Sequence, residues 1–476
     1  MAIPASGPLS MTDIQTEFGG ANPIGLNEYY AGGGLVPAGM TGTYGAVPSS
    51  GEISIRNFYG TSNVSGWYYV LTAQQQYYTP QVGGVQPLST GGWMLSVAAF
   101  SGTTAQSYIL VTDTTGTITT SKYKSSPATF AYFGNKGNAS TFPGDTVPHL
   151  TQGTGGVMTP IDSSVAISGT PAVHNPPYYS SLAPVAGSPS NYQYFASSSY
   201  TYNPEQGFAY MNVGGTNFQT NTRWAKQYTY AGGTWGYIRS GVCKANDPDY
   251  LYVAVQITAP GNSTGILKYD RVQGDIVAGY YVNGFSGGET SVISDPSGNM
   301  YLSNTSGRLI RISADLTSVQ WYKSYSVGAQ NFGYLHAAYY DGYIYMAGSQ
   351  HPNGNYIAKI NPANGDVIWG ITINNSFLYG IDGISVGPNG VVVSGLNDDF
   401  SSGFRKSAIL NYPLSGGLYG NFNSGTLVIA AATVNASSLT ASMSTLSTPA
   451  FVALGTAAGS TFGLTTSAFP YSKVSI

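Results

Sequence analysis

The feature that most constrains the fold is a segment that recurs four times in the C-terminal half of the chain. Its copies begin with a turn and an apolar strand, at DPDYLYVAVQ, DPSGNMYLSN, YDGYIYMAGS and GPNGVVVSGL. When Leu251, Met300, Ile344 and Val391 are aligned, successive copies lie 49, 44 and 47 residues apart. Four strands in roughly 40–50 residues are typical of a β-propeller blade, which buries its faces only by stacking on neighbouring blades.

The other strands of each blade can be predicted from the same alignment. An inner strand precedes each copy, for example SVIS or LHAAYY, and two outer strands follow it, the last of them in SGGLYGNF from Ser415. Upstream, GGWMLSVAAF and SYILVTDTTGTITTSKY predict a further blade with a turn at 113–116. Weaker strands at 163 and 207 are separated by a Pro- and Tyr-rich insertion that starts at His174.

These observations predict an all-β fold. Gly 63 and Pro 26 among 476 residues punctuate runs rich in Thr, Val, Ile and Tyr, which favour strands and turns. We expect a β-propeller of about seven four-stranded blades, with six or eight as alternatives. The tail, 425–476, is also strand-like, and we expect it to close the ring by completing the first blade.

One strand–turn–strand segment has a family resemblance. KINPANGDVIW, from Lys359 to Trp369, resembles the corresponding segment of propellers related to quinoprotein dehydrogenases, where a turn glycine and a strand tryptophan dock adjacent blades. Trp321 occupies the matching place one blade earlier. The resemblance concerns packing, so it implies the fold and gives no reason to expect a quinone or any other cofactor.

Residues 1–62 do not fit the repeat, and we predict that they form a small docking module ahead of a propeller domain at 63–476. Ser10 can cap a short helix, with Asp13 at the capping-box position and Gly19 as the stop. A shorter copy of this pattern follows at Ser54–Gly60. We expect the module to have little core of its own and to dock on a partner through Ile14, Phe18, Tyr29, Tyr30, Ile55, Phe58 and Tyr59.

The combined pattern resembles the N-terminal module of tailed-bacteriophage virion proteins, especially tail-fibre and tail-associated proteins of marine and cyanobacterial phages. The resemblance extends over about 60 residues, or an eighth of the chain, and the matching residues within it are Ser10–Gly20, Asn22–Ile24, Glu28–Tyr30 and Ile53–Gly60. The resemblance implies a protein of the virion tail whose partners are other virion proteins, present as a homo-oligomer or in several copies. The alternative is an arm that plugs one end of its own propeller.

Charge and hydropathy exclude several classes of partner. Charged residues make up 8% of the chain, against about 25% in an average protein, and the net charge is −3. Such a chain has no basic surface for nucleic acid. The longest apolar run, 427–434, is too short to cross a bilayer, and residues 1–9 lack the features of a signal peptide. We expect no membrane insertion and synthesis in the host cytoplasm.

The titratable residues predict no catalytic or metal site. Two carboxylates that flank a sugar bond could hydrolyse glycans, but the pairs Asp247/Asp249 and Asp398/Asp399 fall at predicted turns, where Asp makes turn hydrogen bonds. The four histidines have no metal-ligand spacing, although His336 lies on a predicted inner strand. A glycan depolymerase is therefore the least favoured of the functions considered.

Tyrosines in the insertion are candidates for contact with a ligand or partner. An uncharged polysaccharide is recognised by stacking and by hydroxyl and amide hydrogen bonds, and tyrosine is equally frequent at subunit interfaces. We therefore favour a non-enzymatic phage tail protein, anchored by 1–62, that presents its propeller for host-surface attachment. The alternative is a purely architectural protein that decorates a tail or capsid. The candidate contact residues are Tyr178, Tyr179, Tyr192, Tyr194, Tyr200 and Tyr202.

Overall fold

The computed structural model describes most of the N-terminal module and the strands of the propeller. For residues 122–241 it describes the backbone alone. The described residues are 3–4, 6–36, 40–61, 66–72, 81–88, 90–101, 104–127, 130–133, 147–152, 156–161, 169–170, 172–174, 181–185, 191–199, 206–214, 218–219, 221–229, 235–244, 246–257, 263–270, 275–285, 289–350, 354–374, 377–378, 380–399, 404–422, 427–445, 450–453, 465–466 and 472–475.

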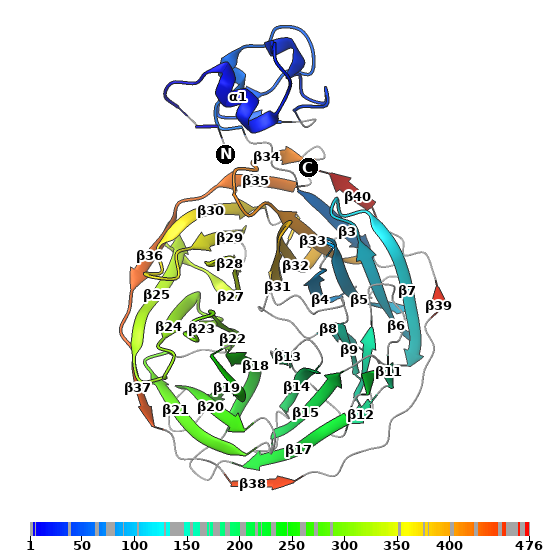
Figure 1. Ribbon diagram of the computed structural model, residues 1–476, viewed down its shortest axis with the longest axis vertical. Helices are drawn as coiled ribbons and strands as arrows, with labels where there is room; N and C mark the ends of the chain where they lie inside the picture. Colours follow the sequence, from blue (N-terminus) through cyan, green and yellow to red (C-terminus); the bar gives the residue numbers. More distant parts are fainter. Residues whose placement is uncertain are drawn as a thin grey trace.

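Antiparallel sheets stand around a centre like the blades of a propeller (Figure 1). Seven four-stranded blades can be followed in the described residues, and the first strand of each lies innermost. The first three blades are β4 (Gln81–Pro87), β5 (Trp93–Ser101), β6 (Thr104–Thr112) and β7 (Ile118–Pro127); β8 (Phe130–Phe133), β9 (Val147–Gln152), β10 (Gly156–Ile161) and β12 (Ala172–His174); and β13 (Ser181–Val185), β14 (Asn191–Ser199), β15 (Gln206–Gly214) and β17 (Asn221–Thr229). The fourth and fifth are β18 (Trp235–Lys244), β19 (Asp247–Ile257), β20 (Ser263–Asp270) and β21 (Ile276–Asn283); and β22 (Glu289–Ser294), β23 (Met300–Asn304), β24 (Arg308–Ile312) and β25 (Val319–Val327). The sixth and seventh are β27 (Gly333–Tyr340), β28 (Tyr343–Gln350), β29 (Gly354–Ile360) and β30 (Val367–Ile373); and β31 (Gly380–Gly387), β32 (Gly390–Asp399), β33 (Phe404–Tyr412) and β3 (Trp67–Thr72). Three further strands are short: β11 (Gly169–Thr170) and β16 (Phe218–Gln219) pair in parallel as a separate sheet, and β26 (Gln330–Asn331) pairs with β25.

The all-β propeller fold predicted from the repeat is confirmed. Leu251, Met300, Ile344 and Val391 all lie on the second strand of their blades, and each is 0% exposed. The spacing of the apolar residues therefore aligned the correct strands, because the same position in each blade must be buried against the next blade.

Ring closure differs from the prediction. The fourth strand of blade 7 is β3, from near the start of the chain, which pairs with β33 from Trp67 opposite Asn411 to Thr72 opposite Lys406. The segment from Ser415, which we had predicted as that strand, instead leads to β34 (Gly420–Phe422). The pairing joins residues more than 300 positions apart, and no local pattern in the sequence indicates it.

The C-terminal segment also has a different role from the one predicted. It does not complete a blade but runs around the outer rim of the ring, and we call residues 427–475 the belt (Figure 1, orange to red). It visits blades 6, 5, 4, 3, 1 and 7 in that order, opposite to the order of the blades in the chain. The only charged residue within its limits is Lys473. Its strands are β35 (Leu427–Ala431), β36 (Val434–Ser438), β37 (Ser442–Thr445), β38 (Ala450–Ala453), β39 (Thr465–Thr466) and β40 (Ser472–Ser475).

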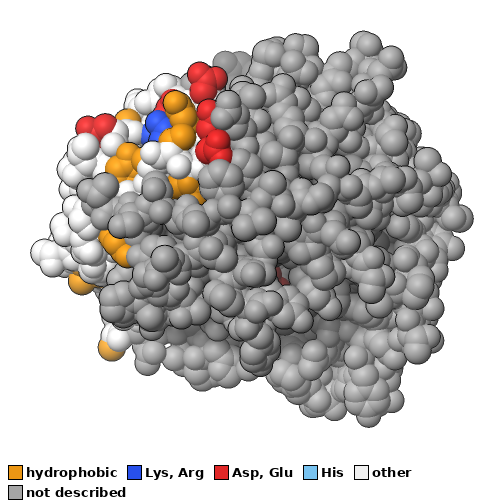
Figure 2. All heavy atoms as spheres, turned by 90° about the horizontal axis from the view of Figure 1, so that it is seen from below, with side chains coloured by type: hydrophobic (Ala, Val, Ile, Leu, Met, Phe, Trp, Pro, Cys, Tyr) orange, Lys and Arg blue, Asp and Glu red, His pale blue; other side chains and the backbone are white. Residues whose placement is uncertain are grey.

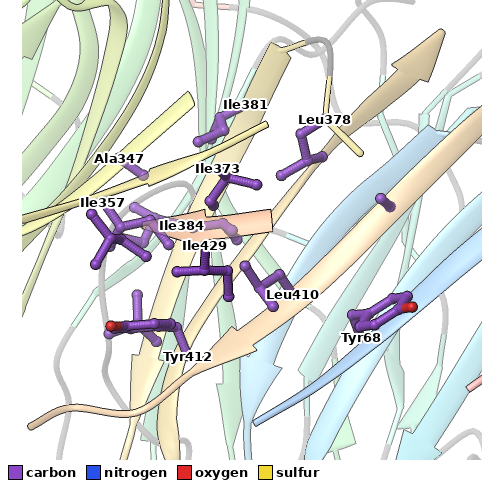
Figure 3. Close-up of a cluster of buried hydrophobic side chains, with 14 of the residues drawn as sticks. Tyr68, Ala347, Ile357, Ile373, Leu378, Ile381, Ile384, Leu410, Tyr412 and Ile429 are labelled. Carbon is purple, nitrogen blue, oxygen red and sulfur yellow. The ribbon is translucent and has the colours of Figure 1, made fainter. Parts of the chain in front are cut away.

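Adjacent blades are held together by apolar cores, of which the one between blades 6 and 7 is drawn in Figure 3. Ile357 and Ile373 from blade 6 meet Ile384 and Leu410 from blade 7, and all four side chains are at most 2% exposed. Ile429 of the belt is buried in the same cluster. The belt therefore contributes apolar side chains as well as main-chain hydrogen bonds here.

The predicted docking of a tryptophan on a glycine of the next blade is present at the seam between blades 5 and 6. A Cβ atom added at Gly365 would lie 3.0 Å from Trp321 Cε3, which is tighter than most Cβ contacts, so glycine lets the indole pack closely on the turn. Trp321 Nε1 donates to Pro362 O at 2.9 Å, and Tyr325 OH donates to Gly365 O at 2.8 Å. The turn 361–366 is thus fixed on the preceding blade by packing and by hydrogen bonds.

Two further seams repeat this arrangement. Trp369 of blade 6 packs against Gly416, where an added Cβ would lie 3.2 Å from the indole ring. Trp67 on β3 packs in the same way against Gly116, in the turn between β6 and β7. The second pair was missed at the sequence level, because Trp67 lies on the strand that closes the ring and was not recognised as part of a blade.

Candidate docking module

The N-terminal module lies outside the ring, above β34 and β35 in the view of Figure 1. Its elements are α1 (Met11–Phe18), the 3-10 turns η1 (Leu26–Glu28) and η2 (Ile55–Phe58), and a hairpin of β1 (Thr41–Gly42) and β2 (Gly45–Ala46). Of the helices that the structure describes, none is both long and apolar enough to cross a membrane.

The capping predicted for α1 is confirmed. Ser10 N donates to Asp13 Oδ2 at 2.8 Å, and Asp13 N donates to Ser10 Oγ at 3.3 Å. The hydrogen bond from the Ser10 side chain lowers the pKa of the Asp13 carboxyl, and the bond from the Ser10 backbone adds to this. Gly19, at φ 78, ends the helix, and its N–H donates to Gln15 O at 2.8 Å. At η2, Ser54 N donates to Asn57 Oδ1 at 2.8 Å, as the shorter copy of the pattern predicts.

The module has a hydrophobic core of its own, which corrects the expectation that it gains one only from a partner. Ile14, Phe18, Tyr29 and Phe58 are between 0% and 3% exposed and belong to one cluster. The Phe58 ring lies 6.0 Å from Phe18 and 6.1 Å from Tyr29, edge to face in both cases. These four side chains therefore stabilise the module from within, and a docking surface must consist of others. Sequence reasoning could not foresee this core, because its halves are about forty residues apart.

The other three predicted docking residues are half-buried and support loops of the module. Tyr30 OH donates to Gly51 O, and Tyr59 OH donates to Gly7 O at 2.6 Å. Ile55 packs on the edge of the core. These contacts show that Tyr30 and Tyr59 fix the loops of the module relative to one another.

A cluster of which the sequence analysis identified only Tyr59 lies at the tip of the hairpin. Tyr44 is 49% exposed, and the Arg56 guanidinium carbon lies 4.5 Å from the centre of its ring. The Tyr59 ring meets Tyr44 edge to face, with centroids 5.7 Å apart. We call Tyr44, Arg56 and Tyr59 the tip cluster. The signal that could have revealed it is Gly-Thr-Tyr-Gly, in which glycines bracket a two-residue hairpin loop.

The predicted tyrosine sites on the propeller are only partly described. Tyr192 and Tyr194 lie on β14, opposite Val213 and Met211 of β15. This corrects the prediction of a loop-rich insertion, because the segment from His174 contains the first two strands of blade 3. The remaining candidates lie outside the described residues: Tyr178, Tyr179, Tyr200 and Tyr202.

Asp247, one of the acids considered for glycan hydrolysis, makes structural contacts. Its Oδ2 accepts from Lys268 Nζ at 2.8 Å and also from Tyr252 OH. Burial alone would raise the pKa of Asp247, but these hydrogen bonds and the nearby lysine charges outweigh that effect and lower it.

Figure 2, which views the molecule from the lower end of Figure 1, shows acidic and hydrophobic side chains gathered around a basic one in the described part of that face.

The other titratable candidates lie on strands. Asp398 and Asp399 lie on β32 opposite Arg405 and Phe404, and not in a turn as predicted. His336 lies on the inner strand β27, as expected, and is 6% exposed. Among the residues with described placement, no group of three or more His, Cys, Asp or Glu side chains could hold a metal ion.

Three cations of blades 4 to 6 share one structural position. Each lies on the third strand opposite a tyrosine of the second, with the charge 5.4–5.7 Å from that ring. The pairs are Lys268 with Tyr252, Arg311 with Tyr301, and Lys359 with Tyr345. Lys268 and Arg311 also face the carboxylates of Asp247 and Asp295, at 2.8 and 3.6 Å. Lys268 and Arg311 therefore neutralise carboxylates within their own blades.

No protein-family model and no curated protein matches the sequence. The chain is similar in fold to BamB from Moraxella catarrhalis, with 13% identity, a TM-score of 0.37, and coverage of 70% of this chain and 85% of that one. It is also similar to the β-propeller domain of Cps50 (Swd1) from Myceliophteria thermophila, with 12% identity, a TM-score of 0.43, and coverage of 71% and 98%. The WD40 propeller domain of Doa1 shows 10% identity, a TM-score of 0.43, and coverage of 73% and 98%. These likenesses concern the propeller fold alone.

Proposed function

We propose that this chain is a structural protein of a bacteriophage tail, which anchors itself through residues 1–62 and presents its propeller for attachment to the host surface. The observation that carries the proposal is the construction of the N-terminal segment. It is a small folded module with its own core, and it lies outside the ring. Its serine-capped helix and its Phe-Tyr-Gly segment resemble the pattern of the N-terminal module of tailed-phage virion proteins.

The connection between module and ring supports this function. The chain passes from Thr61, at the end of the module, to Trp67, at the start of β3, within six residues. Because β3 is the closing strand of blade 7, the short connection ties the module directly to a closed ring. Such an arrangement suits a protein that is held at one end and binds at the other.

A binding role agrees better than a catalytic one with the contacts of Asp247 and with the strand position of Asp398 and Asp399. The carboxylate of Asp247 is hydrogen-bonded to Lys268 and Tyr252, and both members of the Asp398/Asp399 pair lie along a strand. A retaining or inverting glycosidase instead needs two carboxyl groups on either side of a sugar, about 5–10 Å apart. We therefore propose attachment without cleavage.

A purely architectural role is the second candidate, and the rim of the ring favours it. Val277, Ile368 and Leu439 are 47%, 49% and 37% exposed, although each is apolar. Exposed apolar residues on a rim with little charge are suited to contact with neighbouring proteins in a particle. In that case the propeller would join virion proteins to one another and would not bind cells.

The test is the binding of the purified full chain to candidate host cells before and after enzymatic removal of surface glycans. A folded propeller whose binding disappears with the glycans would support host attachment. Binding that survives glycan removal would indicate a protein receptor. A folded chain that binds none of the hosts, yet joins phage particles, would refute host attachment and support the architectural role.

A further inference from the structure

We propose that the tip cluster of Tyr44, Arg56 and Tyr59 is the surface through which the module docks, and that the virion protein on which it docks presents a carboxylate to Arg56. This inference rests on the proposed function and deepens it by identifying the docking surface and the chemistry of its partner.

Exposure distinguishes the tip cluster from the rest of the module. Among the described residues of the module, Tyr44 is the only large hydrophobic side chain that is exposed, at 49%. Phe18, Tyr29 and Phe58 are buried in the core. An aromatic ring that the fold leaves in water gains free energy when a partner covers it, since an aromatic side chain buries about 150–250 Å².

The ring of Tyr44 is also held in place before any partner arrives. Thr43 N donates to Tyr59 O at 2.6 Å, which fixes the hairpin loop on the Phe-Tyr-Gly segment. Added Cβ atoms at Gly42 and Gly60 would collide with Tyr59 O and with Thr43. Both glycines are therefore required for this close approach, and the side chains lose little conformational entropy on binding.

Charge identifies the chemistry of the partner. Arg56 is the only Lys or Arg in residues 1–62, which also contain Asp13, Glu17, Glu28 and Glu52. Within the described part of the chain, no carboxylate forms an ion pair with Arg56, whereas Lys268, Arg311 and Lys323 each pair with one.

The chemistry of Arg56 favours a carboxylate as its ligand. Its guanidinium carbon lies over the Tyr44 ring, 4.5 Å from the ring centre, and Arg56 is exposed. A planar guanidinium binds a carboxylate through two parallel hydrogen bonds. Tyr and Arg together are the residues most enriched where binding energy concentrates at protein interfaces.

The experiment uses full-length protein and particles of the phage that encodes it, prepared without this chain. Cosedimentation with the particles gives the affinity of the wild type and of the variants Arg56→Gln, Tyr44→Ala and Glu52→Gln. Glu52 is a matched control, because it is an exposed charged residue of the same module. We expect losses of about 30-fold for Arg56→Gln and Tyr44→Ala, as for interface residues that contribute about 2 kcal/mol each, and less than threefold for Glu52→Gln.

The outcomes separate the two proposals. If the wild type joins the particles and the Arg56 and Tyr44 variants join them equally well, the tip cluster is not the docking surface, while the anchoring function stands. If the wild type itself does not join the particles, both proposals are wrong. If Arg56→Gln instead abolishes self-association of the free chain in sedimentation velocity, the occupant is a second copy and the proposed partner is refuted. Unchanged urea midpoints verify that the variants are folded.

Discussion

A glycine substitution at one seam of the ring tests how the blades are held together. Gly365 lies at φ 73 in the turn that docks on Trp321, and an added Cβ would meet that indole at 3.0 Å and Lys323 Cδ at 3.1 Å. Gly342 lies at φ 79 in a turn of the same blade, and an added Cβ there would have no atom within 4 Å. The two alanine variants thus share the backbone effect and differ only in the contact between blades.

The magnitude follows from these distances. Alanine in the left-handed region costs about 1–2 kcal/mol at either site, partly offset by the smaller entropy of the unfolded chain. Gly365→Ala additionally forces a methyl group into a packed seam, which costs about 1–3 kcal/mol. We therefore expect Gly365→Ala to lower the free energy of unfolding by about 1–3 kcal/mol more than Gly342→Ala does.

The assay is urea unfolding of both full-length variants, followed by tryptophan fluorescence and by circular dichroism. Agreement of the two probes shows whether one transition describes the unfolding, as a free-energy comparison requires. Ordinary surface substitutions change the free energy of unfolding by less than about 0.5 kcal/mol. If the unfolding free energies of the two variants differ by no more than this, the packing of Trp321 on Gly365 does not stabilise the seam. In a second arm, both glycine substitutions are made in a Trp321→Leu background, in which the methyl group added at position 365 no longer meets the indole. The difference in the free energy of unfolding between the two alanine variants should then largely disappear.

Three further changes have defined outcomes. Leu316 has a left-handed backbone, at φ 61, and its side chain is 2% exposed. Leu316→Gly therefore relieves about 1–2 kcal/mol of backbone strain but loses about 2–5 kcal/mol of core packing. Urea unfolding should show net destabilisation, and a stabilised variant would contradict this account. Ser10 lowers the pKa of the Asp13 carboxyl in the folded protein below 3.8, so this group stabilises the fold at pH values above its unfolded-state pKa, and the stabilisation is lost as the pH falls through its folded-state pKa. An NMR titration should show the pKa of Asp13 rising toward 3.8 in Ser10→Ala, and an unchanged pKa would refute the capping role. Removal of residues 433–476 leaves every described blade with four strands. The shortened chain should therefore keep the circular-dichroism signal of β-structure but unfold at a lower urea concentration. Complete loss of that signal would show that the belt is needed for folding.

Much of the ring was predictable from the sequence because its signals are local. An apolar second strand and a turn recur at a nearly constant spacing, so Leu251 and its equivalents could be aligned by position alone. The capping of α1 by Ser10 was predictable for the same reason, since the interacting groups are three residues apart. Short-range rules also assigned Asp113 correctly to a turn, where its Oδ1 accepts from Thr115 N at 2.9 Å.

The features that were missed depend on contacts between distant residues. Nothing near Trp67 indicates that it belongs to the last blade, because its partner Asn411 lies more than 300 residues away. The belt was misassigned because its strands attach largely through main-chain hydrogen bonds and carry mostly small side chains, which leave a weak pattern. The tip cluster combines residues from a hairpin and from η2, and only the folded module brings Tyr44 and Arg56 together.

The position of β3 has a mechanical consequence. The strand continues from the module, and β33 pairs along one of its edges while β40 pairs along the other. A force that pulls the module away from the ring therefore acts along β3 and loads the hydrogen bonds of both edges at once, in shear. Peeling, in which bonds break one after another, requires a force across a strand. We expect the chain to resist detachment most strongly at the place where the ring is held, since forced unfolding is governed by the rate at which such bonds give way.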